Sequence, residues 1–256
     1  MIKLLYLSLF LFSMAKSDEL TALDIMKYVY QTEKPQTSIM EIKLEITREK
    51  RGKKKVKTRE FIRYTKLYNS GKFTSKSLAK FQSPKIVKGT GLLSWVYRNG
   101  KTDQWFFLPK LKKPKRIQTK EKSKTFLNTD FIYEDLESMN YSSDSLVIIG
   151  TEYLDGNQCK VIMSWPKGES SYYSKKIWVN TQNWQIIKVE FYTSESTMEK
   201  TLYLTNFIEK DGYLTPGKME MRKLNGNKTL MKIQSFEPNI GLKDEMFSNS
   251  FLIKTK

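Results

Sequence analysis

Few side chains in this 256-residue sequence could carry out covalent chemistry. It has no histidine and only one cysteine, which excludes Ser-His-Asp and Cys-His catalytic arrangements and histidine-ligated metal sites. A GxSxG motif is absent, and GTGLLSW is neither a dinucleotide-binding nor a phosphate-loop fingerprint. The carboxylates Glu134 and Asp135 are adjacent, so they point to different faces of an element and are typical of solvent or capping groups, and Asp103 and Asp155 stand alone. We therefore expect neither an enzyme nor a cofactor or metal.

Binding is better supported, because basic residues stand directly beside large apolar ones. Residues 105–117 read WFFLPKLKKPKRI, and residues 48–57 read REKRGKKKVK. The whole chain has 45 Lys and Arg against 27 Asp and Glu, a net charge of +18, which indicates an anionic partner. The basic runs are either solvated loops or an electrostatic rim for anionic lipid headgroups or a membrane surface.

The N-terminus has the layout of a secretory signal peptide. Lys3 precedes an apolar run from Leu4 to Ala15, and small residues precede a cleavage site after Ser17. A run of this length is too short to span a bilayer, although a retained anchor or a buried helix is the alternative. We predict residues 1–17 as the signal peptide and residues 18–256 as one exported domain with a net charge of +16. Export argues against nucleic acid as the partner.

The remaining sequence predicts an antiparallel β-meander. A helix is expected over residues 18–31, with Ser17 or Asp18 as its cap, and from residue 38 apolar and polar residues alternate as in a half-buried strand. Hairpins follow, with turns at residues 48–57, at Asn99-Gly100 (type I′), at Thr181-Gln182, at Asp211-Gly212 and at Gly226. Only residues 119–140 break the series, with a weak helical stripe of Ile132, Leu136 and Met139.

A large meander with one apolar face must close on itself or be covered. Two short helical pieces cannot fill the concave face of a sheet of about ten strands, so we expect the surplus apolar surface to form a cavity or groove. Trp95, Tyr97, Trp105 and Phe107 share one alternation phase across a hairpin and belong either to the core or to the wall of that cavity.

Three sequence blocks resemble the outer-membrane lipoprotein-sorting protein family (LolA-like). They are KGTGLL at 88–93, WFFLPKLKKPKRI at 105–117 and FLNTDFIYEDL at 126–136, and the resemblance continues to the C-terminus. The chain departs from the family pattern at Leu127-Asn128, where Met-Gly is expected, at Phe107 in place of a tyrosine, and at Lys115 in place of an arginine.

The resemblance implies a mainly β fold with few helices, a single curved antiparallel sheet forming an unclosed half-barrel with a helical lid, located in the periplasm. It implies a carrier that binds lipid or lipoprotein acyl chains in the half-barrel and moves them toward the outer membrane. Its expected partners are acyl chains, the anionic membrane surface and an inner-membrane transporter, with no nucleic acid. The alternatives are an envelope regulator or accessory subunit of an RND-type lipid exporter that docks a protein segment, and a secreted polyanion-binding module.

These considerations predict three groups of site residues. The cavity wall is expected to comprise Met40, Ile42, Leu44, Ile46, Trp95 and Trp105. The basic rim is expected to comprise Lys112, Lys113, Lys115 and Arg116. The lid is expected to comprise Phe131, Tyr133 and Leu136.

Overall fold

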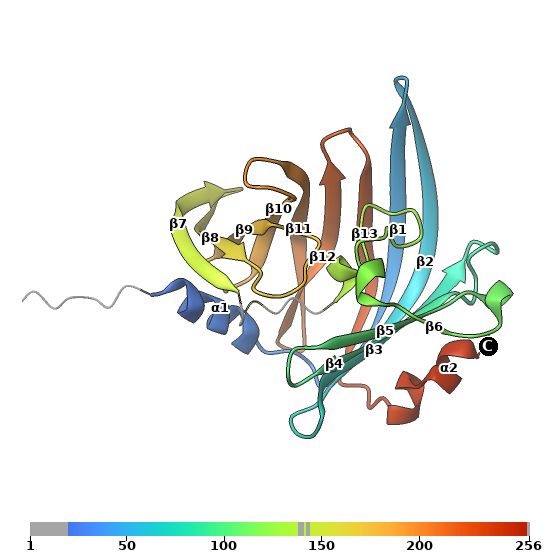
Figure 1. The fold of residues 1–256 in the computed structure, drawn as a ribbon. Coiled ribbons are helices and arrows are strands. Elements are labelled where there is room, and N and C mark those ends of the chain that lie inside the picture. The colour runs from blue at the N-terminus through green and yellow to red at the C-terminus, as the bar shows by residue number, and fades with distance from the viewer. Residues whose placement is uncertain (1–19, 138–140, 142–143, 255–256) are drawn as a thin grey trace, which may run out of the picture.

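One antiparallel sheet, whose neighbouring strands are mostly consecutive in the sequence, organises the chain (Figure 1). The computed structural model describes residues 20–137, 141 and 144–254, so the predicted signal peptide lies outside the described residues. The sheet has 13 strands in the order β6-β5-β4-β3-β2-β1-β13-β12-β11-β10-β9-β8-β7, and β6 and β7 form its two edges. The prediction of a mainly β, unclosed antiparallel sheet is confirmed. The strands are β1 (Thr37–Lys50), β2 (Lys53–Leu67), β3 (Phe73–Ser83), β4 (Gly91–Tyr97), β5 (Thr102–Phe107), β6 (Lys115–Arg116), β7 (Ser145–Leu154), β8 (Asn157–Trp165), β9 (Ser174–Asn180), β10 (Ile186–Tyr192), β11 (Met198–Lys210), β12 (Tyr213–Lys223) and β13 (Lys228–Pro238).

Two short α-helices lie against this sheet. The N-cap of the first is Thr21, which forms a capping box with Asp24, so the helix begins later than residue 18 and neither Ser17 nor Asp18 is its cap. None of the described helices has the length and apolar character that crossing a bilayer requires. The helices are α1 (Ala22–Gln31) and α2 (Asn249–Ile253), and the 3₁₀ turns are η1 (Pro109–Leu111), η2 (Thr119–Glu121), η3 (Glu134–Leu136) and η4 (Asp244–Phe247).

The β1–β2 hairpin is much longer than its sequence suggests. Residues 48–57 were expected to form a turn, but β1 continues to Lys50 and β2 begins at Lys53. Arg51 and Gly52 alone make the turn, with φ values of 52° and 72°, which fit a type I′ hairpin. At Asn99-Gly100 the predicted hairpin is present, but only the glycine has a positive φ, so that turn is not type I′.

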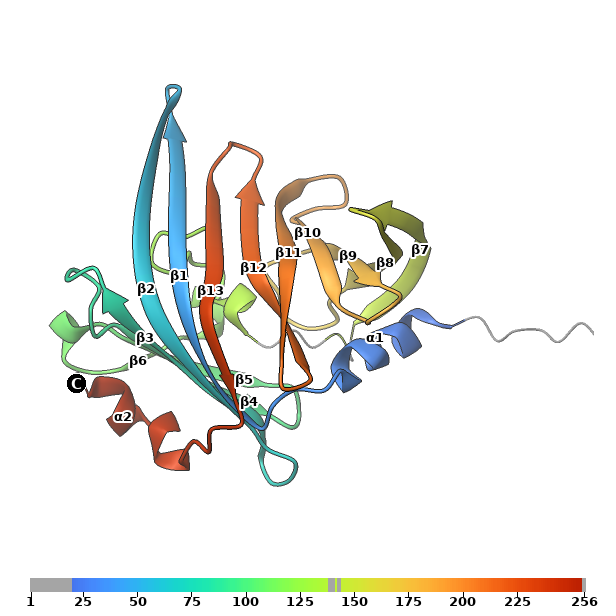
Figure 2. The same ribbon diagram turned by 180° about the vertical axis from the view of Figure 1, so that it is seen from behind.

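The two faces of the sheet carry separate clusters of apolar side chains. The larger cluster lies on the concave face and includes Leu44 and residues of α1. The smaller cluster lies on the opposite face, where α2 and η4 pack on β3, β4 and β5 (Figure 2). The ammonium of Lys80 donates to the carbonyls of Leu252 (2.5 Å) and Lys254 (2.8 Å), and thereby holds the end of α2.

Gly217 allows β12 to pass close to the backbone of β11 at Asn206. A Cβ atom at this position would lie 2.3 Å from the backbone carbonyl oxygen of Asn206, whose own φ is 52°. We expect Gly217→Ala to lower the free energy of unfolding by more than about 2 kcal/mol, because backbone cannot yield as a flexible side chain would. Urea denaturation measures this change. Gly168→Ala, which meets no atom within 4 Å, is the matched control and should be nearly neutral.

Candidate functional site

The concave face of the sheet is a continuous apolar surface. Its rows arise from the alternation of each strand: Ile42, Leu44 and Ile46 of β1 point to the same side and are buried. Leu44 is fully buried, and it pairs with Met231 on β13. The cluster then crosses the sheet through Met221, Leu202, Leu204, Val189, Ile177 and Ile162.

The segment of residues 117–137, here called the cover segment, lies over this face together with α1. Phe126 and Phe131 are buried in the concave cluster, and the Phe126 ring lies 6.0 Å from Phe81 of the sheet and 5.6 Å from Tyr133. Ile25 of α1 joins the same cluster and is fully buried. The expectation that short pieces would leave a large open cavity is therefore wrong for this conformation, because aromatic side chains of a loop fill the space.

The cover segment has little regular helix. The stripe of Ile132, Leu136 and Met139 predicted a helix, but only Glu134–Leu136 forms a 3₁₀ turn, and Met139 lies outside the described residues. Backbone hydrogen bonds within the segment, such as that from the Phe126 N–H to the Phe131 carbonyl at 2.8 Å, shape it as a series of turns. The side-chain contacts described next attach it to the rest of the chain.

A buried ion pair attaches the cover segment to β11. The Lys200 ammonium lies 2.6 Å from an Asp135 carboxylate oxygen, and the two side chains are 0% and 2% exposed. Tyr172 donates its hydroxyl to the other Asp135 oxygen at 2.6 Å, and Lys200 also donates to the carbonyl of Asp130 at 3.1 Å. Burial, reinforced by the Asp135 charge, strongly raises the pKa of Tyr172, which therefore remains a hydrogen-bond donor. Of the two roles expected for Asp135, solvent exposure is wrong, whereas the carboxylate does accept from the backbone N–H of Ile132 at 2.8 Å.

A second anchor joins the cover segment to β1 and β13. Arg48 donates to Asp130 at 2.8 Å, and the Thr229 hydroxyl donates to the same carboxylate at 2.7 Å. The carbonyl of Asn128 accepts from Arg48 at 2.5 Å, and that of Leu127 accepts from Arg59 at 2.6 Å. Positive φ values of 48° and 58° at Leu127 and Asn128 aim these carbonyls at the arginines. These are the positions where the family pattern has Met-Gly, and a glycine would adopt such angles more easily.

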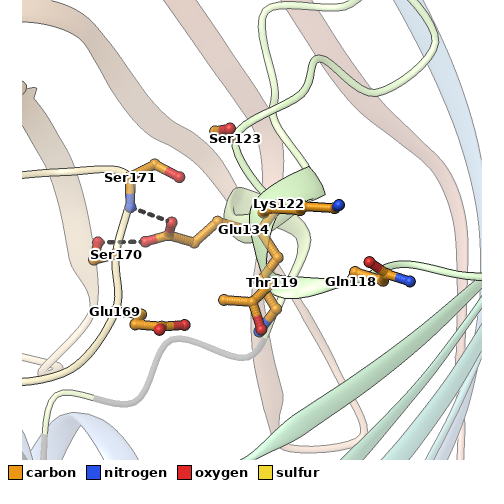
Figure 3. Close-up of a pocket in the computed structure, with 9 residues that line it drawn as sticks. Gln118, Thr119, Lys122, Ser123, Glu134, Glu169, Ser170 and Ser171 are labelled. Atoms are coloured by element: carbon orange, nitrogen blue, oxygen red, sulfur yellow. Dashed lines mark hydrogen bonds between the residues drawn. The ribbon is translucent and has the colours of Figure 1, made fainter.

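Glu134 forms the third anchor, beside a polar pocket (Figure 3). Its carboxylate accepts from the Ser170 hydroxyl and from the Ser171 backbone, each at 2.6 Å. Burial alone would raise the pKa of Glu134, but these hydrogen bonds and the charge of Lys175 hold it below its usual range. The pocket of about 570 Å³ is lined mainly by polar side chains of the cover segment and of residues 169–171, so it does not suit an acyl chain.

A smaller pocket reaches the apolar interior. It has a volume of about 200 Å³ and extends past Tyr141 and Tyr172 to Phe191 and Leu202 of the concave face. Binding sites for small molecules usually have volumes of roughly 300–1,000 Å³, so this pocket is too small for a lipid in the present conformation. Access to the concave face therefore requires the cover segment to move.

The structure brings together the predicted wall residues of β1 and the predicted lid residues. Ile42, Leu44 and Ile46 belong to the concave cluster, and Met40 packs against it. Of the lid residues, Phe131 and Tyr133 are buried in that cluster, while Leu136 packs on it. Burial also raises the pKa of Tyr133 to about 12.

Trp95 and Trp105 do not share this face. They pack together on the opposite side of the sheet, with ring centroids 4.6 Å apart, and the Trp95 indole donates to the carbonyl of Phe247 at 2.8 Å. Both belong to the cluster beneath α2. The alternation of side chains correctly predicted that the two residues lie on the same face. The prediction that this face is the concave wall is wrong, because α2 and η4 form a second apolar layer on the opposite face.

The four predicted rim residues are exposed near one edge of the sheet. Lys115 lies 2.5 Å from Glu121, and Arg116 pairs with Asp103. Lys112 and Lys113 follow η1, where Lys112 adopts a φ of 57°. Lys115, the Gln118 backbone and Lys124 together lower the pKa of Glu121 to about 2. Half of the rim is thus engaged with acidic neighbours.

Three cations that fix the cover segment were not predicted: Lys200, Arg48 and Arg59. The sequence does contain a signal for them, because each occupies a position whose side chain points to the concave face of the sheet. Lys200 precedes Leu202 and Leu204, Arg48 follows Leu44 and Ile46, and Arg59 precedes Phe61. The described residues contain no group of three or more His, Cys, Asp or Glu side chains that could hold a metal ion.

Solved structures share this geometry. A domain from Vibrio parahaemolyticus described as a candidate outer membrane lipoprotein-sorting protein is 26% identical, with a TM-score of 0.83, over 91% of this chain and 98% of that one. A family model described as an uncharacterized protein matches residues 74–254, more than half of the chain. The chain belongs to the family of that model, and it shares the LolA-like fold. A DUF1329 family protein from Desulfovibrio piger is 27% identical, with a TM-score of 0.83, over 90% of this chain and 97% of that one.

The LolA-like fold extends to a more distant relative. A LolA superfamily protein from Nitrosomonas europaea is 19% identical, with a TM-score of 0.69, over 91% of this chain and all of that one. No curated protein matches this sequence. The fold is therefore that of the LolA-like proteins.

Proposed function

We propose that the protein is a periplasmic carrier that binds the acyl chains of a lipid or lipoprotein on the concave face of its sheet and moves them toward the outer membrane. Residues 1–17 would act as its signal peptide and residues 18–256 as the mature single domain. It would perform no covalent chemistry. The LolA-like fold supports this assignment of the class, and the concave face supports the choice of an apolar ligand.

One observation carries the proposal: the apolar face of an unclosed sheet is covered by a loop that polar contacts fix at three separate points. The rings of Phe126, Phe131 and Tyr133 occupy the place that acyl methylene groups would take. Because acyl chains and aromatic side chains are both apolar, a lipid could replace these rings at little cost in hydrophobic contact. The loop would then swing away from the sheet without rearrangement of any strand.

Native mass spectrometry of the mature protein purified from a periplasm tests the proposal. A bound lipid mass, identified after extraction, would support the carrier. A protein that carries no lipid and also fails to take up a fluorescent fatty acid would contradict it.

Weakening the Arg48 anchor should speed ligand entry. In Arg48→Gln, Asp130 would lose its cationic partner, and a hydrogen bond to a charged group contributes on the order of 1.5 kcal/mol. We expect fluorescent fatty-acid uptake to become about tenfold faster. Stopped-flow fluorescence measures this rate. Arg51→Gln removes the same charge at the exposed turn and should leave the uptake rate unchanged. Equal uptake rates in the two variants would contradict the proposal that Arg48 holds the cover segment closed.

The second candidate function, docking of a protein segment by an accessory subunit of an exporter, is favoured by the β7 edge. β7 pairs with β8 on one side only and exposes Val147, Ile149 and Tyr153. An exposed edge of this kind can accept a strand from another protein. Pull-down from an envelope fraction with wild type and with a Val147→Lys/Ile149→Lys variant would separate this function from lipid carriage.

A further inference from the structure

The β1–β2 hairpin projects beyond the rest of the sheet (Figures 1 and 2). Pairing of β1 with β13 ends at Thr47, and pairing of β2 with β3 ends at Glu60. Residues 48–59, here called the arm, therefore form a two-stranded ribbon with no strand on either side. Two-stranded ribbons are marginally stable in water without other support. Packing of the core does not account for this projection, which indicates a role in binding.

The arm is strongly and one-sidedly basic. Between residues 50 and 57 it carries six Lys or Arg and no acidic residue. The register places Lys50 opposite Lys53 and Arg48 opposite Lys55, and like charges in direct opposition destabilise a ribbon. These residues and Lys57 share the phase of Leu44 and Ile46, whereas the other face presents Lys54, which lies 4.0 Å from Glu49.

The cationic face of the arm thus continues the apolar concave face of the sheet. Along β1 the inward row changes from Leu44 and Ile46 to Arg48 and Lys50. An apolar region followed by a cationic one matches the cross-section of an anionic bilayer, in which acyl chains adjoin phosphate groups. A two-stranded ribbon with charges on one face can lie flat on such a surface.

We propose that the arm is a docking element for the surface of an anionic phospholipid bilayer. The choice of a membrane rests on the proposed function, while the charge and geometry of the arm stand independently of it. On docking, phosphate groups would neutralise the opposed lysines and remove their repulsion. Each Lys or Arg near an anionic membrane adds to the attraction, which weakens as salt rises.

The root of the arm also contacts the cover segment. Arg48 and Arg59 bind the carbonyls of Asn128 and Leu127, and Arg48 binds Asp130. A membrane that engages the arm would therefore act next to the contacts that hold the lid. Docking and opening of the lid would then occur at the same end of the ribbon.

Vesicle co-sedimentation tests the inference, using the mature protein with vesicles of phosphatidylcholine alone or mixed with phosphatidylglycerol. Wild type should bind only the mixed vesicles, less strongly at higher salt. Lys53→Gln/Lys55→Gln/Lys57→Gln should weaken that binding between about tenfold and about 100-fold. Thermal denaturation should show that this variant folds, because these side chains are exposed.

A matched variant separates a local effect from net charge. Lys101→Gln/Lys167→Gln/Lys243→Gln removes three exposed charges elsewhere and should bind almost as wild type does. Equal losses in the two variants, or equal binding to both vesicle types, would overturn the inference. So would arm-dependent binding of heparin with arm-independent binding of vesicles, since that result would indicate a soluble polyanion.

Parallel uptake of a fluorescent fatty acid in the absence of vesicles keeps the two proposals apart. Arm-dependent vesicle binding without uptake would refute lipid carriage and leave the arm as a membrane element. If fatty-acid uptake continues and the arm variant binds vesicles as wild type does, membrane docking by the arm would be refuted and the proposal of lipid carriage would stand.

Discussion

Replacing Lys200 with methionine is expected to lower the free energy of unfolding by about 3–5 kcal/mol, since it leaves Asp135 buried without its cation. Methionine has a similar length and fits the apolar surroundings, so the loss would come from the uncompensated carboxylate and not from a cavity. Asp135 also accepts from Tyr172 and from the backbone of Ile132, and these two donors cannot replace a full charge.

Urea denaturation followed by tryptophan fluorescence measures this loss. Lys223→Met is the matched control, because Lys223 pairs with Glu199 at 3.1 Å but both side chains are partly exposed. Exposed pairs contribute only about 0–1 kcal/mol, so this control should change little. The double variant Lys200→Met/Asp135→Leu should regain most of the stability, because it removes both buried charges. A double variant as unstable as Lys200→Met would contradict the explanation.

Much of the fold follows from alternation along single strands. Met40, Ile42, Leu44 and Ile46 predicted both the strand and its buried face, and the structure places them together. The same alternation also marks the position of Lys200, which was not predicted as an anchor of the cover segment: it lies two residues before Leu202 and points to the same face. A lysine in an apolar row predicts a buried acidic partner, but it does not say that the partner lies 65 residues away in a loop.

Other features could not be obtained from local patterns. The phase of Trp95 and Trp105 is clear from the sequence, but the face of the sheet that it selects depends on where α2 packs. The length of the arm was underestimated because Lys-rich segments have low strand propensity, whereas pairing of β1 with β2 carries the ribbon to Arg51-Gly52. Packing of α2 on the sheet decided the first case, and pairing of the two strands decided the second.

Under the proposed function, the anchors would let a closed cover segment and a binding face coexist in one structure. Each anchor joins a short stretch of the cover segment to a different part of the chain: Glu134 to the loop residues 170–171, Asp135 to β11, and Asp130 to β1 and β13. For the segment to leave, the contacts of Asp130, Glu134 and Asp135 would have to be exchanged, and under the proposed function a bound ligand would recover the apolar area that is exposed. The same contacts would keep the apolar face away from water before a ligand binds.

Leu44→Glu should abolish binding of a fluorescent fatty acid while the protein still folds with reduced stability. Leu44 is fully buried at the centre of the concave cluster, so a carboxyl group there would meet apolar side chains and raise the cost of placing an acyl chain beside it. We expect the free energy of unfolding to fall by more than about 3 kcal/mol. Equilibrium titration and urea denaturation of the same preparation measure the two effects.

Two further variants separate loss of binding from loss of stability. Leu44→Ala should be destabilised by about 2–5 kcal/mol yet retain binding, because the wall stays apolar. Ile86→Glu introduces the same carboxylate at a position that is 79% exposed, and it should retain both binding and stability. Wild-type binding by folded Leu44→Glu would remove Leu44 from the wall, and equal loss of binding in Leu44→Ala would show that stability, not polarity, controls uptake.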